Sequence, residues 1–294
     1  MRTLITGATG FLGSHLARRQ IRDGHEVHLV VRPTSAKTAI ADLSAAIHVH
    51  DGTTDQLVDI VATSAPDVCF HLASGFVAEH RRDQIDAMVR DNLGFGTQLL
   101  QALGEQGCTR LVSAGTSWQH FQGADYDPVC LYAAMKKAFE DLATFWVSAR
   151  GLSVVVLRFF DTYGPMDRRG KLFAALDRAA ADATPLAMSG GDQLIDLVYV
   201  DDVIDALDVA GQRVGSLAPR LESFGVSSGA PIPLRQVVAE YSAALGTPIP
   251  VDWGARPYRE REVMVPWHGE PALPDWSPSV PLAEGLRRMV AHSV

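Results

Sequence analysis

The chain has 294 residues, 47% of them hydrophobic, which is enough to build one large or two modest globular domains. Its net charge of −8 excludes the concentrated basic surface of a nucleic-acid-binding protein, so we expect no nucleic-acid partner. Three cysteines without CxxC spacing, the lack of a signal-peptide pattern and the lack of an apolar run near the ~20 residues of a membrane span predict a cytoplasmic protein with no membrane partner.

A glycine-rich turn follows the first predicted strand, residues 2–6. Gly7, Gly10 and Gly13 lead from this strand into an amphipathic helix. In such a unit the first glycine permits the sharp turn, the second lets the backbone approach a pyrophosphate, and the third lets the helix pack on the sheet. A glycine triplet alone could serve packing only, but the strand before it and the helix after it favour a dinucleotide site.

The second predicted strand, EVHLVV, ends at Arg32, with Ser35 and Lys37 close behind. The end of this strand lies beside the adenosine ribose, where NAD-binding proteins place a carboxylate. A guanidinium suits a 2′-phosphate instead. We therefore predict NADP(H) as the cofactor, and the alternative is that Arg32 simply lies at a strand end.

The third and fourth predicted strands cover residues 46–50 and 67–73. Asp51 follows the third strand, where a carboxylate could meet the adenine amino group. His48 and His50 share a face of that strand, but no third ligand lies nearby, so we expect no metal site. A long helix is predicted from about 80 to 105, and its Asn92 is either a contact to the fifth strand or an exposed residue.

The fifth predicted strand, residues 109–115, leads to two hydroxyls and then to a Tyr/Lys pair. Thr116 and Ser117 could hold a substrate carbonyl oxygen, or could cap the local turn. Tyr132 and Lys136 are four residues apart and so share one face of the next helix. A nearby cation favours ionised tyrosine, so we expect Lys136 to lower the pKa of Tyr132 and the pair to transfer a proton.

The sixth predicted strand, residues 152–159, is rich in β-branched residues, which suits a parallel strand covered on both faces. Alternation of strands and helices over ~160 residues predicts an α/β, Rossmann-type doubly wound parallel sheet with its site at the carboxyl ends of the strands. We assign residues 1–165 plus about 194–230 to the cofactor domain, and about 166–193 and 231–294 to a smaller C-terminal substrate-binding domain.

Four further helices are predicted, at about 168–182, from 201, at 234–245 and from 282, together with strands at 194–200 and 223–228. Asp201 and Asp202 begin the second of these helices. Acids at this position are typical of capping, which we favour over paired catalytic carboxylates.

The phrases GATGFLG, YAAMK and VYVDD resemble the extended short-chain dehydrogenase/reductase superfamily of sugar-nucleotide epimerases, dehydratases and reductases. The resemblance covers nearly the whole chain. The phrases GTSWQH, LYAAMKKAFED, RFFDTYGPMDRRGKL, MSGGDQLIDLVYVDD and PDWSPSVPLAEGL are similar to the branch of CDP-abequose synthase and related 4-ketoreductases of nucleotide-linked deoxysugars.

This resemblance implies that Tyr132 is the catalytic acid, that Lys136 is its partner and binds the nicotinamide ribose, and that Thr116 completes the triad. Ser113 and Ser117 are alternatives to Thr116. With the patterns above, the predicted cofactor site is Gly7, Thr9, Gly10, Phe11, Leu12, Gly13, Arg32, Ser35, Asp51, Gly52, Leu72, Ala73, Ser74, Asn92, Tyr132, Lys136 and Phe159. The predicted substrate site is Ser117, Trp118, Gln119, Asp161, Lys171, Gln193 and Arg259.

Two departures from the superfamily narrow the expected reaction. Thr116 is not followed by the acidic pair of the dehydratases, so elimination chemistry lacks its acid and base. Ile195 replaces the Arg of an RDF phrase that binds substrate phosphate, so Lys171, Arg259 or Arg261 must supply that charge.

We expect hydride transfer from NADPH to the C4 keto group of a nucleoside-diphosphate 4-keto-6-deoxyhexose. The alternatives are an NAD-dependent 4-epimerase, a reductase of a non-nucleotide ketone, and a redox-sensing binding module, which retention of the Tyr/Lys pair disfavours. The superfamily also implies a homodimer through the helices at 80–106 and 131–149.

Overall fold

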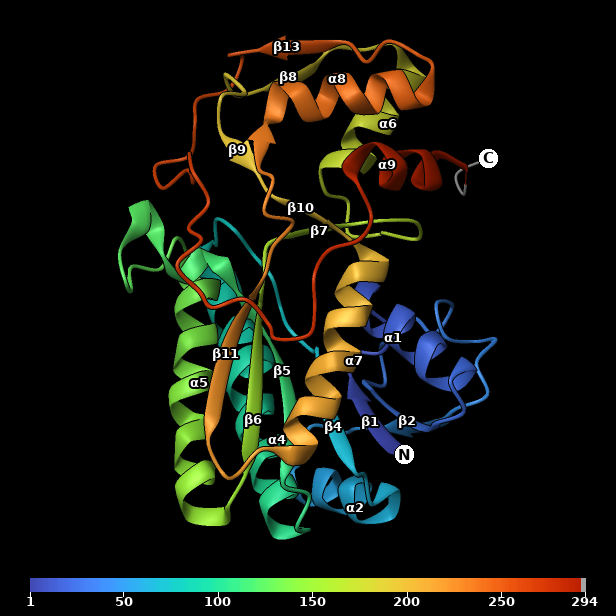
Figure 1. The fold of residues 1–294 in the computed structure, drawn as a ribbon, viewed down its shortest axis with the longest axis vertical. Helices are drawn as coiled ribbons and strands as arrows, with labels where there is room; N and C mark the ends of the chain where they lie inside the picture. Colours follow the sequence, from blue (N-terminus) through green and yellow to red (C-terminus); the bar gives the residue numbers. More distant parts are fainter. Residues whose placement is uncertain (292–294) are drawn as a thin grey trace.

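The computed structural model describes residues 1–291, in which a seven-stranded sheet forms the lower body of the molecule (Figure 1). The strand order is β11-β6-β5-β4-β1-β2-β3, and every neighbouring pair is parallel. The α/β, Rossmann-type doubly wound fold is therefore confirmed. The strands are β1 (Arg2–Thr6), β2 (Glu26–Val31), β3 (Ala46–Val49), β4 (Val68–His71), β5 (Arg110–Thr116), β6 (Ser153–Phe159) and β11 (Leu221–Val226).

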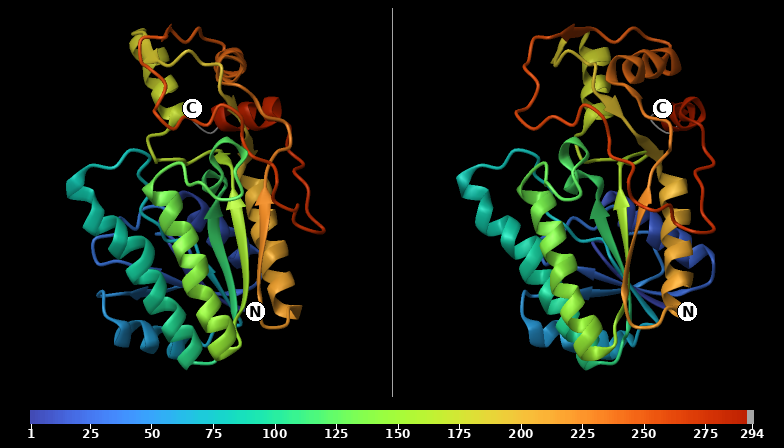
Figure 2. Two further views of the ribbon diagram at one scale, coloured as in Figure 1. Left: turned by 90° about the vertical axis from the view of Figure 1, so that its left-hand side faces the viewer. Right: turned by 60° about the vertical axis from the view of Figure 1, so that its left-hand side comes forward.

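Helices cover both faces of this sheet (Figure 2). α2 (Thr54–Ser64), α4 (Phe95–Glu105) and α5 (Leu131–Arg150) pack on one face, and α1 (Phe11–Arg22) and α7 (Val200–Ser216) pack on the other. All seven residues of β6 are buried, as its β-branched run predicts. The strand order changes direction between β1 and β4, which is where doubly wound sheets open a crevice for ligands.

The helix predicted at 80–105 is divided into four pieces. A 3-10 turn (η1, Arg82–Gln84) and a short helix α3 (Ile85–Val89) precede a π-helical turn (η2, Arg90–Gly94), which continues into α4. A π turn widens the helix by one residue and is often found at functional sites. It brings Asn92, predicted either to contact the fifth strand or to be exposed, into a buried position.

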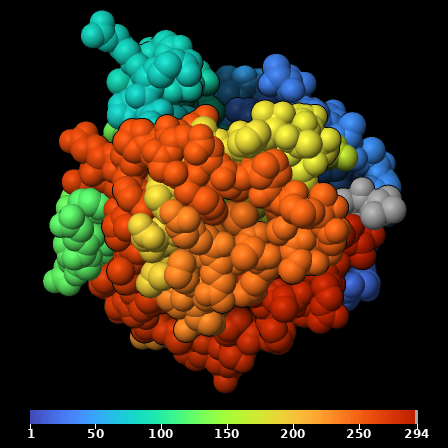
Figure 3. Space-filling model, turned by 90° about the horizontal axis from the view of Figure 1, so that it is seen from above, coloured from blue at the N-terminus to red at the C-terminus, as the bar shows by residue number. Residues whose placement is uncertain are grey.

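A smaller upper part covers the carboxyl ends of the strands. It contains α6 (Leu172–Asp182), α8 (Leu234–Leu245) and α9 (Leu282–Ala291), with three two-stranded sheets among the described residues. These pair β10 (Leu197–Tyr199) with β7 (Asp161–Tyr163), β12 (Ile232–Pro233) with β9 (Leu194–Ile195), and β13 (Val251–Trp253) with β8 (Leu186–Met188). Seen from above, the orange and red C-terminal residues cover much of this face beside the yellow segment around α6 (Figure 3).

Two upper elements differ from their predicted bounds. The strand predicted at 194–200 is split at Asp196, because its buried carboxylate accepts hydrogen bonds from Ser227 Oγ (2.5 Å) and the Ser228 backbone N–H (2.8 Å). α6 begins at Leu172 and not near 168, since Gly170 has a φ of +65° that a right-handed helix excludes. The last residues of the predicted substrate domain, 292–294, lie outside the described part.

None of the helices within residues 1–291 is long and apolar enough to cross a membrane.

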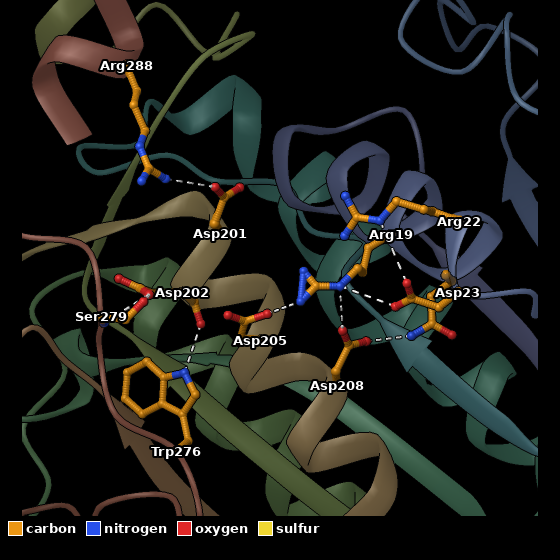
Figure 4. Close-up of polar contacts among 11 residues, drawn as sticks. Arg19, Arg22, Asp23, Asp201, Asp202, Asp205, Asp208, Trp276, Ser279 and Arg288 are labelled. Carbon is orange, nitrogen blue, oxygen red and sulfur yellow. Dashed lines mark hydrogen bonds and ion pairs between the residues drawn. The ribbon is translucent and has the colours of Figure 1, made fainter. Parts of the chain in front are cut away.

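Asp202, near the start of α7, fixes this helix to the segment before α9 (Figure 4). Asp202 is buried, and its carboxylate accepts hydrogen bonds from Ser279 N (3.0 Å), Ser279 Oγ (2.7 Å) and Val280 N (3.0 Å). The Trp276 indole N–H donates to the Asp202 carbonyl (2.9 Å). Asp202 was predicted to cap its own helix, but its carboxylate anchors the segment before α9.

A second polar contact joins α7 to α1 (Figure 4). Arg19 of α1 pairs with Asp205 and, at 3.4 Å, with Asp208 of α7, and the Gln20 amide donates to Asp208 at 2.5 Å. Burial raises the pKa of Asp208 to about 6. These contacts hold α7 alongside α1, whose N-terminus faces the crevice.

We predict that Asp202→Ala lowers the free energy of unfolding by about 2 kcal/mol, because three hydrogen bonds to a buried carboxylate are lost. The neighbouring Asp201 is a matched control, since its exposed carboxylate makes one ion pair of 3.6 Å with Arg288. Asp201→Ala should change stability by about 0.5 kcal/mol or less. Urea unfolding of both variants measures the difference, and equal losses would contradict the anchoring role.

Candidate active site

A cavity of about 540 Å³ lies at the crevice between β1 and β4. Its wall is formed by the loops that follow β1, β2, β3 and β4 and by residues of η2 and α4, so it collects residues far apart in the sequence. Ten of the predicted cofactor residues line it: Gly7, Thr9, Gly10, Arg32, Ser35, Asp51, Gly52, Leu72, Ala73 and Ser74.

The glycine turn at the base of this cavity has no room for side chains. Gly7 has a φ of +72°, and a Cβ placed on it would lie 2.5 Å from the Ala73 nitrogen. A Cβ on Gly13 would lie 2.2 Å from the Gly7 carbonyl oxygen. α1 therefore starts close to β4, and its first N–H groups and positive dipole end face the cavity. This cradle fits the pyrophosphate of a dinucleotide.

Five predicted cofactor residues do not line this cavity: Phe11, Leu12, Gly13, Asn92 and Phe159. Phe11 and Phe159 are core residues. Asn92 donates to the Gly75 carbonyl (3.0 Å) and accepts from Ser74 Oγ (2.9 Å) and Gly75 N (3.1 Å). Asn92 therefore shapes the cofactor wall by fixing the segment after β4.

The adenosine end of the cavity carries Arg32 and Asp51. The Arg32 guanidinium is 67% exposed and lies 3.3 Å from Asp91, which also pairs with Arg90 at 3.1 Å. Two cations thus face the Asp91 carboxylate, so the cluster of these three side chains has a net positive charge. Hydrogen bonds from Thr53 lower the pKa of Asp51, so this carboxylate is an ionised acceptor. Asp91, which no sequence pattern identifies, is a part of the wall that the sequence prediction missed.

Tyr132 lies between this cavity and a second one. Ser74, which lines the cofactor cavity, lies close enough to the Tyr132 hydroxyl to lower its pKa in part. On its other side the Tyr132 ring meets the Phe76 ring edge-on, with centroids 5.0 Å apart, and Phe76 lies 5.7 Å from the Trp118 ring. Phe76 and Trp118 line the second cavity. Tyr132 therefore has neighbours in the walls of both cavities.

Burial has the largest effect on the pKa values of Tyr132 and Lys136. It raises the pKa of Tyr132 to about 12 and lowers the pKa of Lys136 to about 8. The Lys136 ammonium lies 5.8 Å from the centroid of the Tyr132 ring. The prediction that Lys136 lowers the pKa of Tyr132 is wrong for this structure, because desolvation disfavours the charged form of each group. Tyr132 is therefore protonated at neutral pH.

The three candidate hydroxyls for the triad have different surroundings. Thr116 Oγ1 accepts from Trp118 N (3.2 Å) and caps the 3-10 turn η3 (Ser117–Gln119). Ser113 Oγ is buried and has no hydrogen-bond partner among residues 1–291. Ser117 lines the second cavity. Thr116 as the third member of the triad stays a prediction, with Ser113 and Ser117 as its alternatives.

The second cavity, of about 330 Å³, lies between the sheet and the upper part. Six of the seven predicted substrate residues line it: Ser117, Trp118, Asp161, Lys171, Gln193 and Arg259. Gln119 does not, although it was predicted to face the sugar. Its side chain is fully buried and donates to Glu140 (2.8 Å), because the η3 turn directs it into the protein.

The cations of this cavity lie against aromatic rings. The Lys171 ammonium is 5.0 Å from the Phe76 centroid, and the Arg259 guanidinium is 5.2 Å from the Trp118 centroid and pairs with Glu262 at 2.7 Å. Burial lowers the pKa of Lys171. Arg261, the third candidate for substrate phosphate, pairs with Asp127 outside the cavity wall.

Much of the remaining wall was not predicted. It consists of apolar residues that carry no motif, and only the fold brings them together: Phe76, Phe160, Leu172, Phe173, Leu194, Ile195, Leu197, Leu234, Val263, Pro266 and Trp267. In the part of the chain that the structure describes, no group of three His, Cys, Asp or Glu residues could hold a metal ion.

The chain was compared with known proteins. Residues 3–220 match the NAD dependent epimerase/dehydratase family. A probable UDP-glucuronate 4-epimerase of Rhizobium meliloti is 27% identical over 99% of this chain and 96% of its own length. CDP-abequose synthase of Yersinia pseudotuberculosis is 25% identical over 70% of this chain and 72% of its own length. The family match supports a pyridine nucleotide as the cofactor.

The fold was also compared with solved structures. The UDP-glucose 4-epimerase of Thermus thermophilus, in complex with NAD, superposes with a TM-score of 0.85 at 23% identity, covering 99% of this chain and 98% of that one. This likeness supports the Rossmann-type fold, and the sequence matches include both epimerases and a synthase of the predicted ketoreductase branch.

We predict that Gly13→Ala weakens dinucleotide binding at least about tenfold, because its Cβ forces the Gly7 carbonyl, and with it the cradle, to move. Gly215→Ala in α7 is a matched control, since a Cβ there meets no atom of the described chain within 4 Å. Fluorescence titration with reduced cofactor measures both variants. Unchanged affinity in a folded Gly13→Ala variant would contradict the cradle.

Proposed function

We propose that this chain, which belongs to the NAD dependent epimerase/dehydratase family, is an NADPH-dependent ketoreductase. Its substrate would be a nucleoside-diphosphate 4-keto-6-deoxyhexose, reduced at C4. The observation that carries the proposal is the position of Tyr132 between a dinucleotide cavity and a second cavity with cations at its wall.

The cofactor would bind to the glycine cradle, Asp51 and the segment 72–74, and Lys136 would hold its nicotinamide ribose. The bound cofactor supplies the hydride. Thr116, or one of its alternatives Ser113 and Ser117, would orient the substrate oxygen beside Tyr132. Alignment of the two ligands and stabilisation of the developing oxyanion would then account for most of the acceleration.

Tyr132 is protonated at neutral pH, as proton donation in the reductive direction requires. A reduction needs a tyrosine that gives its proton to a developing alkoxide, and a pKa of about 12 keeps Tyr132 protonated at neutral pH. An oxidation would begin with removal of a proton from a hydroxyl by ionised tyrosine. In this structure burial opposes that ionised form.

The wall of the second cavity supports a deoxygenated sugar that carries an anionic diphosphate. Phe76 lies next to Tyr132 and Trp118 lies next to Phe76, so their rings present mostly apolar surface to the sugar. Lys171 and Arg259 would bind the diphosphate, with Arg259 exchanging its contact with Glu262 for one with phosphate.

A second candidate function is an NAD-dependent 4-epimerase, because a probable 4-epimerase matches nearly the whole chain. An epimerase would retain bound NAD through purification and would consume no NADPH. A reductase of a non-nucleotide ketone is the third candidate, and it would not be inhibited by nucleoside diphosphates.

We also propose the domain division of residues 1–165 plus about 194–230 against 166–193 and 231–294. A homodimer through α4 and α5 is proposed on the same basis of family resemblance. The exposed Leu142 and Phe145 on α5 are compatible with such a contact.

We predict that a panel of nucleotide-linked 4-keto-6-deoxysugars contains a substrate that oxidises NADPH, with the product alcohol identified by NMR. Tyr132→Phe should lower kcat by about 10²- to 10⁴-fold, because the proton donor is lost, while cofactor affinity stays near that of the wild type. Tyr126→Phe, an exposed tyrosine of the preceding loop, is the matched control and should be fully active. Full turnover by Tyr132→Phe would refute the assignment.

We predict that the protein binds NADPH more tightly than NADH and that Arg32→Ala removes the preference. The loss of a charge-assisted contact to the 2′-phosphate should weaken NADPH binding by about tenfold to a hundredfold and leave NADH unaffected. Arg81→Ala is the control, since Arg81 is similarly exposed, at 69%, and lies outside the cavity wall. Equal affinities of the wild type for both cofactors would contradict the role of Arg32.

A further inference from the structure

A buried ion network lies directly behind the Tyr132–Lys136 pair. Glu140 follows Lys136 by one turn of α5 and is buried. Its two carboxylate oxygens accept hydrogen bonds from Gln119 Nε2 (2.8 Å) and Arg158 Nη2 (2.7 Å). Arg158, on β6, also pairs with Glu270 of the C-terminal segment. The network thus joins α5, η3, β6 and the segment that precedes α9.

The charges of this network do not balance without Lys136. Glu140 and Glu270 are two carboxylates, and Arg158 is a single cation between them. His120 lies 3.4 Å from Arg158 Nη1 and 3.6 Å from Glu270, but burial lowers the pKa of His120, which favours its neutral form. Because an uncompensated buried charge is costly, the remaining negative charge calls for one more cation nearby. Lys136, one turn from Glu140, supplies it.

We propose that Glu140 is a positioning residue, which keeps the Lys136 ammonium charged and, through Gln119, fixes the η3 turn that carries Ser117 and Trp118. The expected effect of Glu140 on turnover rests on the proposed function, whereas its effect on the protonation of Lys136 does not. Glu140 acts through Lys136 and the turn, since its oxygens are directed to Arg158 and Gln119 and not to either cavity.

Among the titratable groups around Lys136, Glu140 is the one that favours the charged form of the lysine. Burial lowers the pKa of Lys136, and Glu140 is the group that raises it. His71 of β4 also faces Lys136, but burial and the Lys136 charge lower the pKa of His71 to about 3, so it is neutral. The Tyr132 hydroxyl is protonated at neutral pH, as its raised pKa requires. Without Glu140, Lys136 would lose its proton at a lower pH.

The same network contacts the wall of the second cavity on its far side. Glu270 lies three residues after Trp267, and the His120 ring stacks on the Trp267 ring with centroids 3.6 Å apart. Glu270 pairs with Arg158, whereas Glu140 is one turn from Lys136. Glu270→Gln therefore removes one negative charge from the same network, but at a position that is not next to Lys136. It is the matched control for Glu140→Gln.

The test is an NMR titration of the lysine side chains, which requires no turnover. The chain has only four lysines, Lys37, Lys136, Lys137 and Lys171, so protein labelled at lysine Cε gives few signals, assigned by Lys→Arg variants. The wild-type Lys136 signal should titrate near pH 8. Glu140→Gln should move its midpoint to lower pH by about one unit or more, while Glu270→Gln leaves it close to the wild-type value.

An unchanged Lys136 midpoint in folded Glu140→Gln, or an equal shift in Glu270→Gln, would overturn the proposal. If Glu140→Gln does not fold, Glu140→Asp replaces it, and a smaller shift in the same direction is expected because the carboxylate is drawn back by one methylene. No shift in Glu140→Asp would be equally decisive.

Kinetics provide the second readout. With an active substrate, the alkaline limb of the kcat profile should move to lower pH in Glu140→Gln and stay in place in Glu270→Gln. A shifted Lys136 titration in a protein that reduces none of the nucleotide sugars would retain the role of Glu140 and reject the proposed function instead. If the Lys136 midpoint shifts in Glu140→Gln but the alkaline limb of its kcat profile does not, the kinetic part of the inference is overturned.

Discussion

The burial of the Lys136 ammonium is the constraint on which much of the site depends. Lys136 is 4% exposed and lies on a helix packed against the sheet, where the charged form is disfavoured by desolvation. A buried cation persists only with compensation from nearby negative charge, and Glu140 on the next turn of α5 provides it. Glu140 in turn requires Arg158, and Arg158 is shared with Glu270. One buried charge thus requires partners on α5, β6 and the C-terminal segment.

The two cavities differ in the groups that form their walls. The cofactor cavity uses backbone: glycines that exclude Cβ atoms, and the free N–H groups at the start of α1. The second cavity uses side chains, with Lys171 and Arg259 lying over aromatic rings. A cation held against a ring in a partly desolvated wall is poorly hydrated, so it gains more from an incoming phosphate than an exposed cation would.

The sequence predicted what local patterns encode and missed what side-chain direction and long-range contacts decide. The parallel sheet, the glycine turn and the Tyr132–Lys136 pair follow from periodicity and spacing. Gln119 could not be placed, because a 3-10 turn sets its direction and its partner Glu140 is 21 residues away. Arg32 and Asp91 are 59 residues apart, and Arg158 and Glu140 are 18 apart. The pKa of Tyr132 was predicted in the wrong direction, because spacing reports neighbours and not burial.

The C-terminal segment shows why these long-range contacts matter for chemistry. It is held to the sheet domain at one end by Glu270 on Arg158, and at the other by Ser279 on Asp202 of α7. Trp267, which lines the second cavity, lies shortly before the first of these anchors. Each anchor contains a buried carboxylate, of Glu270 or Asp202, so moving the segment away would leave a buried charge without its partner. The wall of the second cavity is therefore fixed relative to α5, and under the proposed function reactants held there would need little further ordering before a proton or hydride moves.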